Sequence, residues 1–192
     1  SYPYGLRYYE YAINGSTPSG QTGITYNGNT YTGFLLNGQP YLLRGVCMHD
    51  DIDGKANALN NSDYVQEFAI VQELNCNFIR LAHYPHPKEV YDKCDELGII
   101  VQTEVPCVNK FRTPDAASDP CPQDYYDHLY MQYEDMVRQH YNHPCIMFWG
   151  VGNEINTLVS SGDEAKNFVK DKIQGYRTTI RTLLPNALVG YT

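Results

Sequence analysis

The sequence has no excess of positive charge: its 192 residues carry 14 Lys and Arg against 22 Asp and Glu, a formal net charge of −8. Such a chain offers no basic surface for nucleic acid or an anionic membrane. It also has no apolar run near the roughly 20 residues of a membrane-spanning helix. No signal peptide is visible, and residues 1–5 are typical of a cut inside a longer protein. We therefore expect neither nucleic acid nor a membrane as partner; compartment and oligomeric state stay open.

Paired metal-binding motifs are missing as well. The six cysteines are scattered with no C-x-x-C pair, which disfavours a zinc site of the usual spacing and favours free thiols over a disulfide framework. The spacing His83-x-x-His86 encloses a Tyr-Pro turn and gives no helical alignment of the two rings. We predict no metal and no cofactor.

What is present is a globular composition, with 42% hydrophobic residues, enough for a sizeable core. Residues 6–12 are compatible with one strand, and residues 14–33 predict a long polar loop or loose hairpin. The pair Asn37-Gly38 lies between two short apolar runs, 34–36 and 41–43, and predicts a β-hairpin.

Strands and helices then alternate along the chain. Apolar runs predict strands at 42–47, 77–82, 99–103, 145–151 and 187–191, and helical periodicity predicts helices at 62–74, 87–97, 124–141 and 163–184. Ser62 or Asp63 can cap the first helix, and Gly98 fits the end of the second. Alternating units of this kind indicate a parallel sheet, as either a doubly wound sheet or a (β/α)8 barrel.

Polar residues follow each of the first four predicted strands: His49-Asp50-Asp51, His83-Tyr84-Pro85-His86, Glu104 and Asn153-Glu154. Polar and ionisable residues at four successive strand ends favour a barrel with an active site at that rim. No Gly-rich phosphate loop follows the first strand, which weakens the alternative of a nucleotide-binding doubly wound sheet. A full barrel needs about 250 residues, so the chain holds little more than half of one. The acidic loop with Asp50, Asp51 and Asp53 is interpreted as solvated.

Three segments resemble glycoside hydrolase family 2, which includes β-galactosidases, β-glucuronidases and β-mannosidases. They are residues 34–46, the run from Asn77 to Pro85 with its continuation to Ile100, and the run from Asn142 through Trp149 to Glu154. The resemblance covers roughly residues 34–154 and departs from the family pattern at Leu81 and at His140-Tyr141. The loop after Glu104 does not show the acidic, His-containing pattern that holds magnesium in some β-galactosidases.

The resemblance implies the N-terminal half of a (β/α)8 TIM barrel, about strands 1–5, in residues 34–192. Residues 1–33 are then the end of a preceding β-sandwich domain and a connecting loop. The implied activity is that of a retaining exo-β-glycosidase acting on terminal β-linked sugars, most like a β-galactosidase, with a carbohydrate as partner. Glu154 is the implied acid/base, and the nucleophile, on a seventh strand, is expected beyond this chain.

The chemistry suits these residue types. Retaining cleavage uses two carboxyl groups roughly 5–5.5 Å apart, one as acid and then base, the other as nucleophile. An acid that works near neutral pH needs a raised pKa, and we expect the tip of an apolar strand to bury the Glu154 side chain. Asn153 can bond a sugar 2-hydroxyl, and Arg80 is expected to orient carboxylates inside the barrel. The remaining substrate-binding candidates are His49, His83, Glu104 and Trp149.

Other interpretations stay open. Glu154 can be a surface carboxylate at a helix start, Asn153 a loop cap, and His49 and His83 structural histidines. Glu104 fits a substrate contact and a structural ion pair equally. At the level of the whole chain, the alternatives are a β-glucuronidase or β-mannosidase, a sugar-binding barrel without turnover, and an inactive structural fragment.

Overall fold

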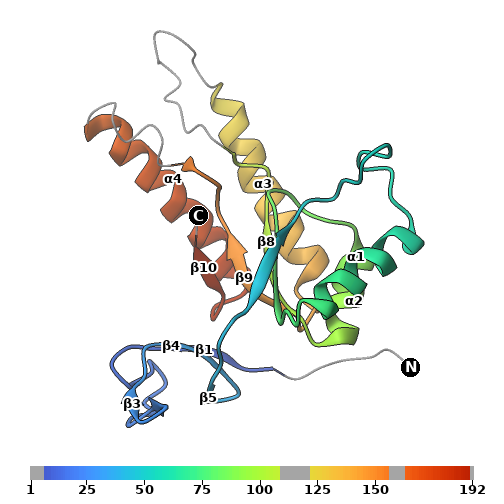
Figure 1. The fold of residues 1–192 in the computed structure, drawn as a ribbon. Helices are drawn as coiled ribbons and strands as arrows, with labels where there is room; N and C mark the ends of the chain where they lie inside the picture. The colour runs from blue at the N-terminus through green and yellow to red at the C-terminus, as the bar shows by residue number, and fades with distance from the viewer. Residues whose placement is uncertain (1–6, 109–121, 156–162, 191–192) are drawn as a thin grey trace.

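The computed structural model describes residues 7–108, 122–155 and 163–190 (Figure 1). Its centre is a parallel five-stranded sheet with the strand order β10-β9-β8-β7-β6. The strands are β6 (Gly45–Met48), β7 (Phe78–Leu81), β8 (Ile100–Glu104), β9 (Ile146–Gly150) and β10 (Leu188–Gly190). Each strand pairs with the next one in the chain, as consecutive βα units of a barrel do.

Four helices connect these strands: α1 (Asn61–Glu73), α2 (Lys88–Leu97), α3 (Gln123–His140) and α4 (Asp163–Leu183). One face of the sheet packs on them in a single apolar core, to which β7 contributes Ile79 and Leu81 and the helices contribute Phe68, Tyr91, Tyr133 and Tyr176. The opposite face carries Phe78, Arg80, Gln102, Glu104 and Phe148. The alternation of side chains along each strand therefore separates a helix-facing core from an inner barrel face. No helix among the described residues is long and apolar enough to cross a bilayer.

The start of α1 differs from the expectation that Ser62 or Asp63 caps it. Asn60 is the N-cap: its side-chain oxygen accepts a hydrogen bond from the backbone N–H of Ser62 at 2.9 Å. Asp63 is the third helical residue and accepts from the backbone N–H of Asn60 at 2.9 Å, which completes a capping box. Lys55 contacts the same carboxylate at 2.6 Å. The expected end of α2 is confirmed, because Gly98 ends it with a φ of 73°.

A small antiparallel sheet precedes the barrel strands. It has the order β1-β4-β5 and contains β1 (Tyr9–Ala12), β4 (Gly33–Leu36) and β5 (Gln39–Pro40). Asn37 and Gly38 form the β4–β5 turn with φ values of 52° and 77°, so the predicted hairpin is present. The segment between β1 and β4 contains a second hairpin, β2 (Thr25–Tyr26) with β3 (Asn29–Thr30). The assignment of residues 1–33 to a preceding sandwich stays a prediction; the small sheet takes strands from both sides of residue 33.

The small sheet lies at the amino-terminal end of the parallel strands (Figure 1), and aromatic packing attaches it there. The ring of Phe34 lies edge-on to that of Phe148 with centroids 4.8 Å apart, and Phe148 meets Phe78 at 6.0 Å. The Tyr9 hydroxyl donates to the carbonyl of Pro144, just before β9, at 2.8 Å. The small sheet therefore covers the amino-terminal end of the half-barrel, opposite the carboxyl ends of the strands.

Candidate active site

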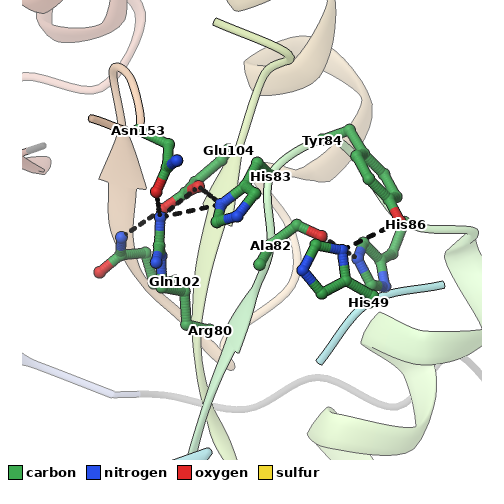
Figure 2. Close-up of polar contacts among 9 residues, drawn as sticks. All are labelled: His49, Arg80, Ala82, His83, Tyr84, His86, Gln102, Glu104 and Asn153. Atoms are coloured by element: carbon green, nitrogen blue, oxygen red, sulfur yellow. Dashed lines mark hydrogen bonds and ion pairs between the residues drawn. The ribbon is translucent and has the colours of Figure 1, made fainter. Parts of the chain in front are cut away.

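The carboxyl ends of β6 to β9 bring most of the predicted site residues to one edge of the sheet (Figure 2). His49 follows β6, His83 follows β7, Glu104 ends β8, and Asn153 follows β9. Parallel strands impose this convergence, because all of their carboxyl ends point the same way.

An ion pair between Arg80 and Glu104 lies at the centre of the group. Arg80 Nε donates to Glu104 Oε1 at 2.7 Å, and Arg80 Nη2 donates to Oε2 at 3.0 Å. The Glu104 side chain is 1% exposed and that of Arg80 14%, so the pair is nearly dry. Burial alone would lower the pKa of Arg80, but the hydrogen bonds and charge of Glu104 outweigh it and raise that pKa. Of the two roles considered for Glu104, the structure shows the ion pair.

Two features that the sequence analysis missed hold Glu104 in place. Gln102 lies two residues earlier on the same face of β8, and its Nε2 donates to Glu104 Oε1 at 2.6 Å. Gly150 is the register partner of Glu104 on β9. A Cβ at Gly150 would lie 2.6 Å from Glu104 Cγ, so only glycine leaves room for this carboxylate. The available signal was the two-residue spacing between Gln102, on the predicted strand 99–103, and Glu104 directly after it.

Arg80 also bonds the two residues at the rim. Its Nη2 contacts His83 Nδ1 at 3.0 Å and donates to Asn153 Oδ1 at 2.8 Å (Figure 2). His83 Nδ1 lies 3.4 Å from Glu104 Oε2. Arg80 therefore connects the ends of β7, β8 and β9 through hydrogen bonds, and its support role in a sugar site stays a prediction.

The strand tip after β9 places Glu154 differently from Asn153. Asn153 is buried, and its backbone N–H donates to the carbonyl of Cys107 at 2.9 Å. Glu154 is exposed and has a φ of 53°, in the left-handed region. The described residues therefore do not bury its side chain, contrary to the expectation from the apolar strand before it.

His49 belongs to a second group of rings beside the first. Its ring lies edge-on to that of His83 at 5.0 Å, and its Nδ1 is 3.4 Å from the Tyr84 hydroxyl. Tyr84 accepts from the backbone N–H of Asp50 at 3.2 Å and stacks on His86 at 5.3 Å. Burial lowers the pKa of His86, which is 3% exposed. Tyr84, which the sequence analysis did not select, thus connects the ends of β6 and β7.

Trp149 lies elsewhere. Its register partner is Thr103, whose hydroxyl bonds the Tyr91 hydroxyl of α2 at 2.7 Å. Trp149 is 4% exposed and belongs to the core between sheet and helices. The structure therefore does not bring Trp149, a predicted substrate contact, to the group around Arg80.

One set of potential metal ligands occurs in the described part of the chain, at the amino-terminal end of the sheet. The ligand atoms of Asp95, His143 and Cys145 lie within 4.8 Å of one another. Asp95 Oδ2 already accepts from His143 Nδ1 at 2.7 Å, and Asp95 Oδ1 accepts from the Cys145 backbone N–H at 2.8 Å. Burial would raise the pKa of Asp95, but these hydrogen bonds lower it. Both oxygens of Asp95 thus already accept hydrogen bonds, and the three residues connect α2 to the start of β9.

Comparison with known proteins places this fold in a family. Residues 30–181 match the model of glycosyl hydrolases family 2, TIM barrel domain. A β-glucuronidase of Bacteroides fragilis is 36% identical over 149 residues, or 76% of this chain and 20% of that protein. A β-galactosidase of Bacteroides ovatus is 32% identical over 132 residues, 68% of this chain and 15% of that protein.

Among solved structures, the β-glucuronidase of Parabacteroides merdae superposes with a TM-score of 0.75 at 27% identity, over 98% of this chain and 20% of that one. The chain thus spans 15–20% of the length of these three relatives. The five parallel strands in barrel order and the family match confirm the predicted partial barrel. The chain belongs to glycoside hydrolase family 2 and forms part of its TIM-barrel domain.

Proposed function

We propose that this chain is part of a retaining exo-β-glycosidase that hydrolyses terminal β-linked sugars, with Glu154 as general acid and then base. The observation that carries the proposal is the strand edge at which Asn153-Glu154 follows β9, beside the network of Arg80, Glu104 and His83. Barrel enzymes place catalytic groups at this end of the strands. The family relationship supports the same assignment.

The residues of this network have different proposed roles. Both Glu104 oxygens accept hydrogen bonds from Arg80, so we propose that Glu104 positions Arg80 rather than contacting the sugar. Asn153, His83 and His49 lie at the carboxyl ends of the strands and are the proposed sugar contacts. The second carboxylate, the nucleophile, is proposed to lie outside residues 1–192, roughly 5–5.5 Å from the acid in the assembled site.

Two substrate classes are supported by separate observations. The sequence resemblance favours β-galactosides, whereas the β-glucuronidase of B. fragilis is more similar to this chain, at 36% identity, than the β-galactosidase of B. ovatus, at 32%. We propose a terminal β-galactoside or β-glucuronide as the substrate. Paired nitrophenyl β-galactoside and β-glucuronide assays on the longer protein that carries this chain decide between them by kcat/KM.

The acid role is tested with Glu154→Gln in that longer protein. The substitution keeps the size of the side chain and removes the proton donor, so kcat/KM for an alkyl glycoside, whose leaving group needs the proton, should fall by about 10²–10⁴-fold. Glycosylation by a dinitrophenyl glycoside, whose leaving group needs little acid help, should lose much less. Equal losses for the two leaving groups would exclude the acid role.

The isolated 192-residue chain is the matching control. It should show no turnover of either aryl glycoside, because the proposed nucleophile lies outside it. Turnover by the purified chain alone would contradict the proposed location of the nucleophile.

A further inference from the structure

We infer that Arg80 fixes the hydrogen-bonding polarity of the sugar-facing rim: it holds His83 as the Nε2–H tautomer and Asn153 with its amide NH₂ outward, so that both residues present N–H donors to a ligand. This inference deepens the proposed function and takes from it only the identity of the ligand. It concerns the rim's donor and acceptor pattern, which determines which ligand atoms the site can accept.

The partners of His83 Nδ1 determine which ring nitrogen carries the proton. A guanidinium can only donate, so the 3.0 Å contact from Arg80 Nη2 requires a lone pair on His83 Nδ1. Glu104 Oε2 would favour a proton on the same nitrogen, but it lies at 3.4 Å, beyond a good hydrogen bond. A proton on Nδ1 would also set two N–H groups against each other at 3.0 Å. The shorter contact therefore decides the tautomer, and the proton of a neutral His83 lies on Nε2.

Arg80 also determines the orientation of the Asn153 amide. Arg80 Nη2 lies 2.8 Å from Oδ1, and only the oxygen of the amide can accept from it. Figure 2 shows the amide nitrogen of Asn153 pointing away from Arg80. The backbone hydrogen bond from Asn153 to Cys107 at 2.9 Å fixes the residue from its other side. Its two amide hydrogens are therefore directed away from the buried ion pair.

The carboxylate of Glu104, the charged acceptor of the network, already accepts hydrogen bonds from protein donors. Glu104 is buried, and it accepts from Arg80 on both oxygens and from Gln102 on Oε1. The carboxylate between these donors, Glu104, therefore already has its hydrogen bonds within the protein. The ligand atoms that match are acceptor oxygens, which in a sugar are the hydroxyl oxygens whose own protons are donated elsewhere.

The tautomer can be read directly by NMR. In the longer protein that carries this chain, labelled with ¹⁵N at its histidines, long-range ¹H–¹⁵N correlation spectra distinguish protonated from unprotonated ring nitrogens, and His83→Gln identifies the His83 signals. We expect a protonated Nε2 and an unprotonated Nδ1 in the wild-type protein. A protonated Nδ1 with a bare Nε2 would overturn the inference.

Arg80→Met isolates the role of the arginine. With the donor gone, Glu104 becomes the nearest partner of His83 Nδ1, so the ring should switch to a protonated Nδ1. Gln102→Leu is the matched control, because it removes a donor to Glu104 and leaves Arg80 intact; its His83 spectrum should match the wild type. A wild-type tautomer in folded Arg80→Met would overturn the assignment to Arg80.

A second variant covers the case in which Arg80→Met does not fold because Glu104 is left buried and unpaired. Arg80→Met/Glu104→Leu removes both partners of Nδ1, and a detectable Nδ1–H population should appear that the wild type lacks. An unchanged spectrum in this variant would equally overturn the inference. These outcomes do not depend on turnover, so a failure of the proposed glycosidase activity would leave them readable.

Discussion

The fit of Glu104 over Gly150 gives a prediction that can be worked from the structure. In Gly150→Ala the new Cβ would lie 2.6 Å from Glu104 Cγ, 3.1 Å from Oε1 and 3.2 Å from Cδ. Ordinary contacts of a Cβ begin near 3.4 Å. Glu104 is fully buried and held by Arg80 and Gln102, so it has no free direction in which to move.

The expected cost follows from two terms. Overpacking a filled site costs about 1–3 kcal/mol, and weakening a buried ion pair adds to it, up to about 3–5 kcal/mol if the pair is broken outright. Because the pair should be strained and not lost, we expect Gly150→Ala to lower the free energy of unfolding by about 2–4 kcal/mol. Urea unfolding followed by circular dichroism measures this value.

The control is Gly190→Ala. Gly190 is the register partner of Gly150 on β10, and a Cβ there would meet no atom within 4 Å. A Glu104→Ala background adds a second check, because it removes the Cγ that the new methyl group meets and should reduce the cost of Gly150→Ala by at least about 1 kcal/mol. The steric reasoning is refuted if Gly150→Ala and Gly190→Ala destabilise equally, within about 0.5 kcal/mol.

Three further changes test other parts of the fold. Burial, with the charges of His143 and Lys88, lowers the pKa of His140 from 6.5 to about 4. The stability that comes from keeping the buried His140 ring neutral is therefore complete above pH 6.5 and is lost as the pH falls toward 4, at no more than about 1.4 kcal/mol per pH unit. His140→Phe, which keeps the stacking on Tyr91, should remove that slope from urea titrations. Asn60→Ala should cost about 1 kcal/mol through the lost N-cap of α1, with Asn61→Ala as the neutral neighbour. Glu154→Gly should be more stable than Glu154→Ala by about 1 kcal/mol, because only Ala pays for the left-handed φ; equal thermal stability would show that the turn is not strained.

Much of the fold could be predicted because its signals are local. Asn37-Gly38 between two apolar runs determines a hairpin, and alternating strand and helix patterns determine a parallel sheet. The cap of α1 could not be chosen, because four consecutive residues, 60–63, can all cap a helix. Asn60 is selected because the Asp63 carboxylate accepts a hydrogen bond from its backbone N–H, and Lys55 holds that carboxylate in place.

The site was predictable in its location more than in its contacts. Strand ends identified His83, Glu104 and Asn153, but a single sequence does not show that one guanidinium bonds all three. Trp149 was assigned by its place in a motif, whereas the alternation along β9 puts its side chain on the helix side of the sheet, opposite Phe148. The alternation of side chains along a strand, which the sequence shows, would have placed Trp149 and Phe148 on opposite faces of the sheet.

The turn after β9 explains why neighbouring residues in one motif have such different environments. Asn153 and Ile155 are both buried, and a Cβ at Gly152 would lie 2.7 Å from Ile155 Cγ2, so the chain is tightly packed on both sides of Glu154. A left-handed Glu154, with its φ of 53°, lets one exposed residue stand between two buried ones. Such a conformation costs about 1 kcal/mol in a residue other than glycine and persists only where the surroundings impose it. Here the hydrogen bonds of Asn153 to Cys107 and Arg80 hold the residue before Glu154, and buried Ile155 holds the residue after it, so Glu154 keeps its left-handed backbone between two fixed neighbours.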